Sequence, residues 1–148
     1  MDKRSFLKTS SVLAGGAFIS RFESCTPEEK KEHLKNWAGN LEYSTGNVYY
    51  PKTVAEVQET VKKYKKIKAL GSRHSFNKIA DSTENQVSLS ELNKLVSLDT
   101  TAHTVTVEAG MSYGELAPLL HEKGYAIHNL ASLPHITIAG SVATATHG

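Results

Sequence analysis

The sequence is poor in the features that define several protein classes. Its single cysteine, Cys25, excludes an intrachain disulfide framework and a zinc site built on cysteines. No apolar run approaches the roughly 18–20 residues that span a bilayer. The net charge is only +2, and the basic run Lys62–Lys66 is typical of a solvated helix face rather than of a nucleic-acid patch. What remains, 148 residues with 39% hydrophobic content, indicates a globular chain with a core.

The first 25 residues differ in character from the rest and are set aside from the fold. Lys3 and Arg4 precede the weakly apolar segment Ser11–Ile19, a pattern similar to a twin-arginine export signal with lysine in the first position of the pair. Cys25 is a candidate lipid-attachment site, although the residues before it fit a lipoprotein cleavage site poorly. We therefore expect an exported, periplasmic protein that contacts a membrane only if Cys25 is lipidated. A cytoplasmic protein with an amphipathic start is the alternative.

A helix, a strand and a glycine-containing turn follow one another in the first half of the chain. Thr53–Glu56 has the pattern of a capping box, and apolar residues at helical spacing follow it at Val54, Val57, Val61 and Tyr64. Ile67–Leu70 is predicted to be a strand, and Gly71–Asn77 the turn at its carboxyl end. Ligands bind preferentially at this end of the strands in α/β sheets.

The turn combines residues that suit an anionic ligand with a histidine. Gly71 allows a sharp bend and a close approach of the backbone. Successive N–H groups in such a turn form an anion-binding concavity, to which Arg73 adds a charge and Ser72 and Ser75 add hydroxyl donors. This suits a phosphate or pyrophosphate, while His74 suits a nucleophilic ring held against a cofactor. The alternative is a polar surface turn with an incidental histidine.

A hairpin and a second helix are predicted in the second half. Gln86–Leu89 and Leu95–Leu98 are short strands, and Thr104–Ala109 alternates strictly between apolar and polar residues, as a half-buried hairpin strand does. A second capping box, Ser112–Glu115, begins a helix whose apolar face is Leu116, Leu119 and Leu120 and which ends at Gly124. Pro118 predicts a short first segment or a kink, and an extended segment is expected over Tyr125–His128.

Small residues dominate the stretch from Ala139 to Thr146, where only Val142 is larger than threonine. They would let the backbone lie flat against a ligand, or else permit close packing of a core helix, and composition does not separate these interpretations. The seven histidines are too irregularly spaced for a metal-binding helix and have no acidic residue grouped with them, so we expect no metal site.

Three stretches taken together resemble the vanillyl-alcohol-oxidase (PCMH) type of FAD-binding flavoproteins. They are GSRHSFN from Gly71, VEAGMSYGEL from Val107, and LASLPHITIAGSVATATHG from Leu130. Within that superfamily they are most similar to the alditol (xylitol, sorbitol) oxidases and next to the sugar-1,4-lactone oxidases. The resemblance runs from about Trp37 to Gly148.

The resemblance implies an α+β fold, the first subdomain and part of the second of an FAD-binding domain. It implies that the pyrophosphate lies in the turn and that His74 is bonded covalently to the 8α-methyl group of the flavin. The implied FAD-binding residues are Ala69, Leu70, Gly71, Ser72, Arg73, His74, Ser75, Ser132, Thr137, Gly140, Ser141, Val142, Ala143 and Thr144. Small residues and N–H-rich turns are physically suited to that role.

The resemblance also implies an oxidase that acts on the CH–OH group of an alditol, with oxygen as acceptor and hydrogen peroxide as product. Alternatives are a sugar-1,4-lactone oxidase or dehydrogenase, or a non-catalytic flavin-binding fragment. We expect a linker or short helix over residues 26–36 and the incomplete FAD-binding domain over residues 37–148. The substrate domain and the catalytic residues are expected beyond Gly148, so the 148 residues alone are expected to be inactive.

Overall fold

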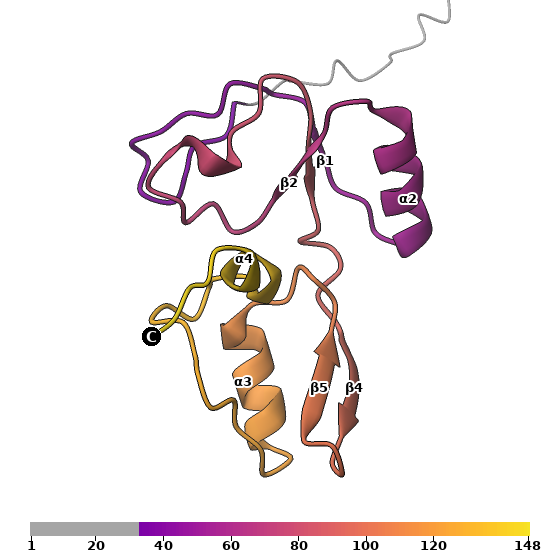
Figure 1. Cartoon of the computed structure of the whole chain (residues 1–148), viewed down its shortest axis with the longest axis vertical. Coiled ribbons are helices and arrows are strands. Elements are labelled where there is room, and N and C mark those ends of the chain that lie inside the picture. Colours follow the sequence, from indigo (N-terminus) through magenta and orange to yellow (C-terminus); the bar gives the residue numbers. More distant parts are fainter. Residues whose placement is uncertain (1–32) are drawn as a thin grey trace, which may run out of the picture. The chain divides into compact units, whose positions relative to one another are not determined.

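The computed structural model describes residues 33–148 (Figure 1). Contacts divide the chain into two units, residues 1–30 and residues 31–148, and the fold described below belongs to the second unit. The predicted export segment, Cys25 and most of the predicted linker lie outside the described residues. Residues 33–36, the described part of the predicted linker or short helix, contain no helix.

A three-stranded parallel sheet carries the first part of the unit. Its order is β1 (Val48–Tyr49), β3 (Gln86–Ser88) and β2 (Lys68–Leu70). Val87 on the central strand pairs with Tyr49 on one side and Ala69 on the other. All three residues of β3 are buried, as the central position requires. The predictions of strands at residues 67–70 and 86–89 are confirmed to within one residue.

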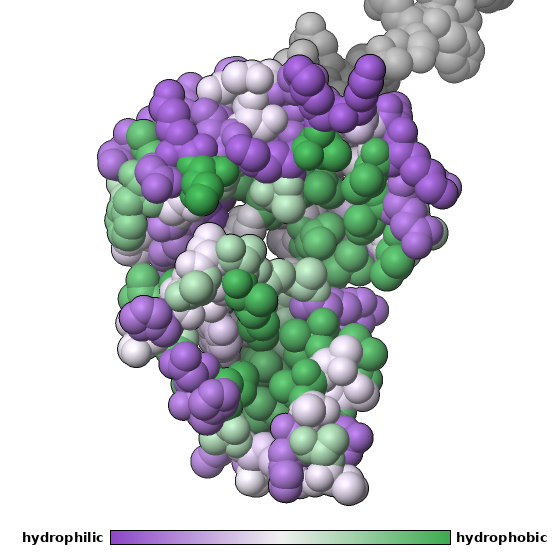
Figure 2. All heavy atoms as spheres, in the orientation of Figure 1, coloured by the Kyte–Doolittle hydropathy of each residue, from purple (hydrophilic) through white to green (hydrophobic). Residues whose placement is uncertain are grey.

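Helix α2 (Val54–Lys63) connects β1 to β2 and begins at the predicted N-cap. The Thr53 hydroxyl accepts from the Glu56 N–H at 3.2 Å, but the Glu56 carboxylate accepts from the Lys52 N–H at 2.7 Å instead of closing a capping box on Thr53. The helix has no buried residue, and Val54 and Val61 are 63% and 49% exposed. The apolar face that the spacing predicts is therefore exposed or half-buried within the described residues. In Figure 2 the outer edge of α2 is hydrophilic, and hydrophobic surface lies beside it.

The predicted hairpin is present as β4 (Leu95–Asp99) and β5 (Thr104–Val107), paired antiparallel. Asp99 closes its turn by accepting from the N–H groups of Thr101 and Ala102, each at 2.9 Å. Val105 and Val107 are partly buried and alternate with exposed threonines. This confirms the alternation that the sequence predicts, although the strand ends two residues before Ala109.

Helix α3 (Tyr113–His121) packs against the hairpin and supplies Leu116 and Leu120 to a hydrophobic cluster with three buried residues. Met111, Leu116 and Leu120 are its buried residues, and the partly buried hydrophobic residues around them are Leu95, Leu98, Val105, Val107, Tyr125, Ile127 and Ile138. The capping box of Ser112 and Glu115 is complete. The helix continues through Pro118 instead of ending in a short first segment there. The segment that follows, Tyr125–His128, forms no strand.

The predicted stop at Gly124 is confirmed. This glycine has φ +78°, and the N–H of Tyr125 donates back to the Leu120 carbonyl at 2.9 Å. The chain then runs through a loop to the short helix α4 (Ile138–Ala143). None of the helices within residues 33–148 has both the length and the apolar character needed to cross a membrane.

The architecture is the mixed helix-and-strand fold that the sequence predicts, with a parallel sheet followed by a helix-covered hairpin. The connection from β2 to β3 includes the 3-10 turn η2 (Lys78–Ala80). The turn Gly71–Asn77 lies in this connection, immediately after β2.

Candidate functional site

The site is built on the turn that follows β2. Leu70 is the last residue of the strand and is buried, so the chain leaves the sheet from a fixed point. Arg73 has φ 63°, in the left-handed region that non-glycine residues seldom adopt. This conformation reverses the chain direction just before His74.

A segment from before the sheet holds this turn in place. The Trp37 N–H donates to the Arg73 carbonyl at 2.8 Å, and the Arg73 guanidinium donates to the Lys35 carbonyl at 3.0 Å. The side-chain amide of the buried Asn36 donates to the Ser75 carbonyl at 3.0 Å. We call residues 35–37 the strap. It bonds the backbone on both sides of His74, which is how the strained Arg73 conformation is kept.

The turn offers a run of unused backbone donors. Within residues 33–148, the N–H groups of Ser72, Arg73, His74 and Ser75 donate no hydrogen bond to another described residue. Consecutive free N–H groups in a turn form a concavity suited to an anion. The phosphate-binding interpretation of the turn thus agrees with the geometry.

The turn meets the beginning of α4 across 65 residues of sequence. The Thr137 N–H donates to the Ser72 hydroxyl at 3.2 Å. A Cβ atom on Gly71 would lie 3.0 Å from the Thr137 hydroxyl oxygen, and one on Gly140 would lie 2.8 Å from it. That hydroxyl is buried and has no hydrogen-bond partner among the described residues. Glycine at both positions therefore allows this buried hydroxyl to pack directly against the two backbones.

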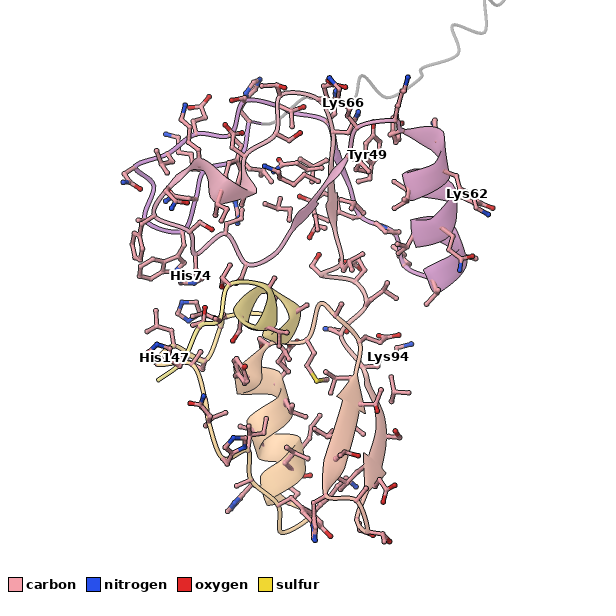
Figure 3. All side chains as sticks on the ribbon, viewed as in Figure 1. Tyr49, Lys62, Lys66, His74, Lys94 and His147 are labelled. Carbon is pink, nitrogen blue, oxygen red and sulfur yellow. The ribbon has the colours of Figure 1, made fainter. Side chains whose placement is uncertain are left out.

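His74 lies in a cluster of three rings from three separate segments. Its ring centroid is 4.7 Å from that of Trp37, stacked at 27°, and 4.4 Å from that of His135, tilted at 43°. Trp37 and His135 are also stacked on each other, at 5.6 Å. Burial, and then the charge that His135 can carry, lower the pKa of His74 below 6.5. Its Nε2 atom is buried without a partner among the described residues, and the ring is therefore held neutral near pH 7. Figure 3 shows His74 on the side of the turn that faces the chain near α4.

The remaining sequence-predicted residues take up different positions. Ser141 is buried, and its hydroxyl is 3.0 Å from that of Tyr113, so this side chain is already bonded inside the unit. Val142 is 76% exposed. Exposure also applies to Ala69, Ser132, Ala143 and Thr144. Since only Ser141 of α4 is fully buried, the interpretation of this stretch as a packed core helix is wrong for the described residues.

Sequence reasoning missed three residues of the site: Asn36, Trp37 and His135. Trp37 is the sole tryptophan, and an isolated Trp next to an Asn in a polar segment was the available signal. His135 was considered only as a metal ligand. Within residues 33–148, no three His, Cys, Asp or Glu side chains are grouped in a way that would hold a metal ion.

The arrangement defines a class of domain before any relative is considered. It combines a parallel sheet, free amides at a strand end, small residues opposite them and a neutral histidine ring, as a nucleotide-cofactor domain does. The cholesterol oxidase of Brevibacterium sterolicum has a similar fold, with a TM-score of 0.66 over 78% of this chain and 24% of that chain, at 21% identity.

Residues 46–148 match the family described as FAD binding domain, and the chain belongs to this family. Among relatives, the alditol oxidase of a Streptomyces species is 46% identical over 118 residues, which are 78% of this chain and 28% of that protein. The D-arabinono-1,4-lactone oxidase of Kluyveromyces lactis is 35% identical over 123 residues, 78% of this chain and 23% of that protein. The chain thus spans about a quarter of the length of these relatives.

Proposed function

We propose that this chain is the FAD-holding N-terminal part of an oxidoreductase that oxidises the CH–OH group of an alditol, with oxygen as acceptor. The observation that carries the proposal is the junction of the Gly71–Ser75 turn with Thr137, in a chain that is 46% identical to an alditol oxidase over 118 residues. FAD, when bound, supplies a two-electron acceptor for the hydride of the substrate.

The described residues fit FAD by three features. The free N–H groups of Ser72–Ser75 suit the pyrophosphate charge, and the guanidinium of Arg73 adds a positive charge beside them. Gly71 and Gly140 allow the turn and α4 to approach each other closely around the buried Thr137 hydroxyl. The exposed small residues Ala143 and Thr144 leave the backbone at the end of α4 accessible to a flat ring system.

His74 is the residue that we propose to carry the flavin covalently. Attachment exchanges one C–H bond of the 8α-methyl group for a C–N bond to the imidazole. It releases one proton from the carbon and one from the imidazole, and leaves two electrons that oxygen takes up to give hydrogen peroxide. The neutral state of His74 supports this role because only an unprotonated ring nitrogen has a lone pair to form the bond.

The substrate is proposed from the relatives rather than from this part of the chain. We propose an alditol such as xylitol or sorbitol as the substrate because the identity with the alditol oxidase is higher. A sugar-1,4-lactone is the alternative substrate, based on the lactone oxidases at 31–35% identity. The residues that choose between them, and the catalytic base, are proposed to lie beyond Gly148. For the first 25 residues we propose the role of an export signal of the twin-arginine type.

The test uses the full-length protein and its His74→Ala variant, with His128→Ala as the matched control, since His128 is an exposed histidine outside the ring cluster. Acid-precipitated wild type and control should be yellow, and precipitated His74→Ala colourless. Peroxide production on xylitol, sorbitol and a 1,4-lactone then identifies the substrate class. Slow reoxidation in air would instead indicate a dehydrogenase, and a protein that never binds flavin would overturn the proposal.

A further inference from the structure

The two rings beside His74 come from segments that lie far apart in the sequence. Trp37 belongs to the strap, which lies before residue 46, where the match to the FAD binding domain begins. His135 belongs to the loop before α4. Both rings nonetheless contact the same imidazole, at 4.7 and 4.4 Å between centroids. Three mutually contacting rings limit the orientations open to the His74 imidazole.

The strap gives Trp37 a fixed position, so its ring is more than an incidental neighbour. Its backbone N–H bonds Arg73, and the adjacent Asn36 is only 4% exposed and bonds Ser75. Asn36 itself is held, since its side-chain oxygen accepts from the Leu41 N–H at 3.0 Å. The Trp37 ring is therefore anchored to the same turn that presents His74.

Charge around the three rings favours a neutral imidazole. His135 on the loop is the titratable group whose charge acts on His74. Arg73 precedes His74 in the chain, and its guanidinium donates to the Lys35 carbonyl. No acidic side chain is hydrogen bonded to His74 among residues 33–148. A proton on His74 would thus face only like charge and a buried edge.

We propose that Trp37 and His135 are positioning residues that hold the His74 ring, neutral and in one orientation, for attachment of the flavin. This inference rests on the proposed covalent role of His74. It extends that role to two rings that do not themselves bond the cofactor. Stacking fixes the plane of the ring, and the strap fixes the backbone from which it projects.

The test measures attachment directly. Full-length protein made flavin-free is incubated with FAD at about two pH units above 6.5, where histidines are neutral in every variant. The flavin retained in acid precipitates is followed with time. We expect Trp37→Ala and His135→Ala to attach flavin about 2- to 10-fold more slowly, the factor that the loss of one aromatic contact corresponds to. Trp37→Phe and His135→Phe, which keep a ring, should stay close to wild type, as should His128→Ala.

A second readout does not require flavin. The rate at which diethyl pyrocarbonate modifies His74, followed by peptide mass spectrometry against pH, reports the pKa of this residue. His135→Phe removes the like charge and Trp37→Ala removes burial, so both should raise the pKa of His74 toward 6.5.

The two readouts separate this inference from the proposed function. Flavin that dissociates on precipitation of the wild type would end the covalent proposal, and the modification profile would still test whether the two rings hold His74. Attachment rates and modification profiles that are unchanged in both alanine variants would overturn the inference. Equal slowing by His135→Phe and His135→Ala would overturn ring contact as the cause.

Discussion

The close approach of Gly140 and Thr137 predicts whether alanine at position 140 stabilises or destabilises α4. A Cβ on Gly140 would lie 2.8 Å from the Thr137 hydroxyl oxygen, closer than side chains normally approach. Gly140 lies inside α4, where alanine would otherwise be preferred to glycine by about 1 kcal/mol. Overpacking costs about 1–3 kcal/mol, so Gly140→Ala alone should destabilise α4 by about 1 kcal/mol.

Removing the obstacle should reverse that effect. Thr137→Ala deletes the oxygen, which is buried and has no hydrogen-bond partner among the described residues, so no bond is lost with it. In this background Gly140→Ala should stabilise α4 by about 1 kcal/mol, a coupling of about 2 kcal/mol between the two sites. Thr144→Ala is the matched control because Thr144 is exposed and its hydroxyl bonds the Gly140 carbonyl without facing the new Cβ.

Hydrogen–deuterium exchange of the α4 amides in the full-length protein measures this local stability. The Ser141 N–H, which donates to the Thr137 carbonyl at 3.0 Å, and the Thr144 N–H are the reporters. Exchange should be about fivefold faster in Gly140→Ala and about fivefold slower when Gly140→Ala is added to Thr137→Ala. The same sign in both backgrounds, or rescue by Thr144→Ala, would refute the steric reasoning.

Three further predictions concern stability. Leu116→Ala should lower the free energy of unfolding by about 2–5 kcal/mol because Leu116 is 1% exposed in the hydrophobic cluster. A urea titration measures this loss, and a loss below about 1 kcal/mol would contradict the burial of Leu116. Gly110→Ala should prevent accumulation of folded protein because the new Cβ would overlap the backbone of Leu89 and approach the Leu92 carbonyl at 2.9 Å, which solubility and circular dichroism would reveal. The pKa of His74 is lowered on folding, so the unfolded chain binds the proton first as the pH falls below 6.5. The free energy of unfolding of the flavin-free protein should therefore decrease over this pH range, and His74→Phe should reduce the decrease. Urea midpoints measured across the range test this.

Local patterns were sufficient to predict the elements around the site. The Ser112–Glu115 capping box, the Gly124 stop and the alternation of Thr104–Val107 each depend on neighbours within a few residues, and the structure has all of them. The short first segment, one of the two outcomes predicted at Pro118, is not present, because a helix can continue past a missing hydrogen bond when its apolar face packs on a core, as Leu116 and Leu120 do.

Whether the apolar face of α2 is buried or exposed could not be predicted from local patterns. Its valines have the spacing of an apolar face, yet Val54 and Val61 stay exposed within the described residues. Periodicity reports which residues share a face and contains no information on what covers that face. The same limit applied to the small residues of α4, whose composition suited burial and ligand contact equally.

The sequence by itself determined the turn chemistry of Gly71–Ser75, the order of the elements and, through its motifs, the membership of an FAD-binding family. Only the tertiary structure decided that Trp37 and His135 enclose His74 and that Ser72 meets Thr137 across 65 residues. The reason is physical. Capping, turns and alternation are set by near neighbours along the chain, whereas ring contacts between distant segments exist only once the sheet and the strap have brought their backbones together.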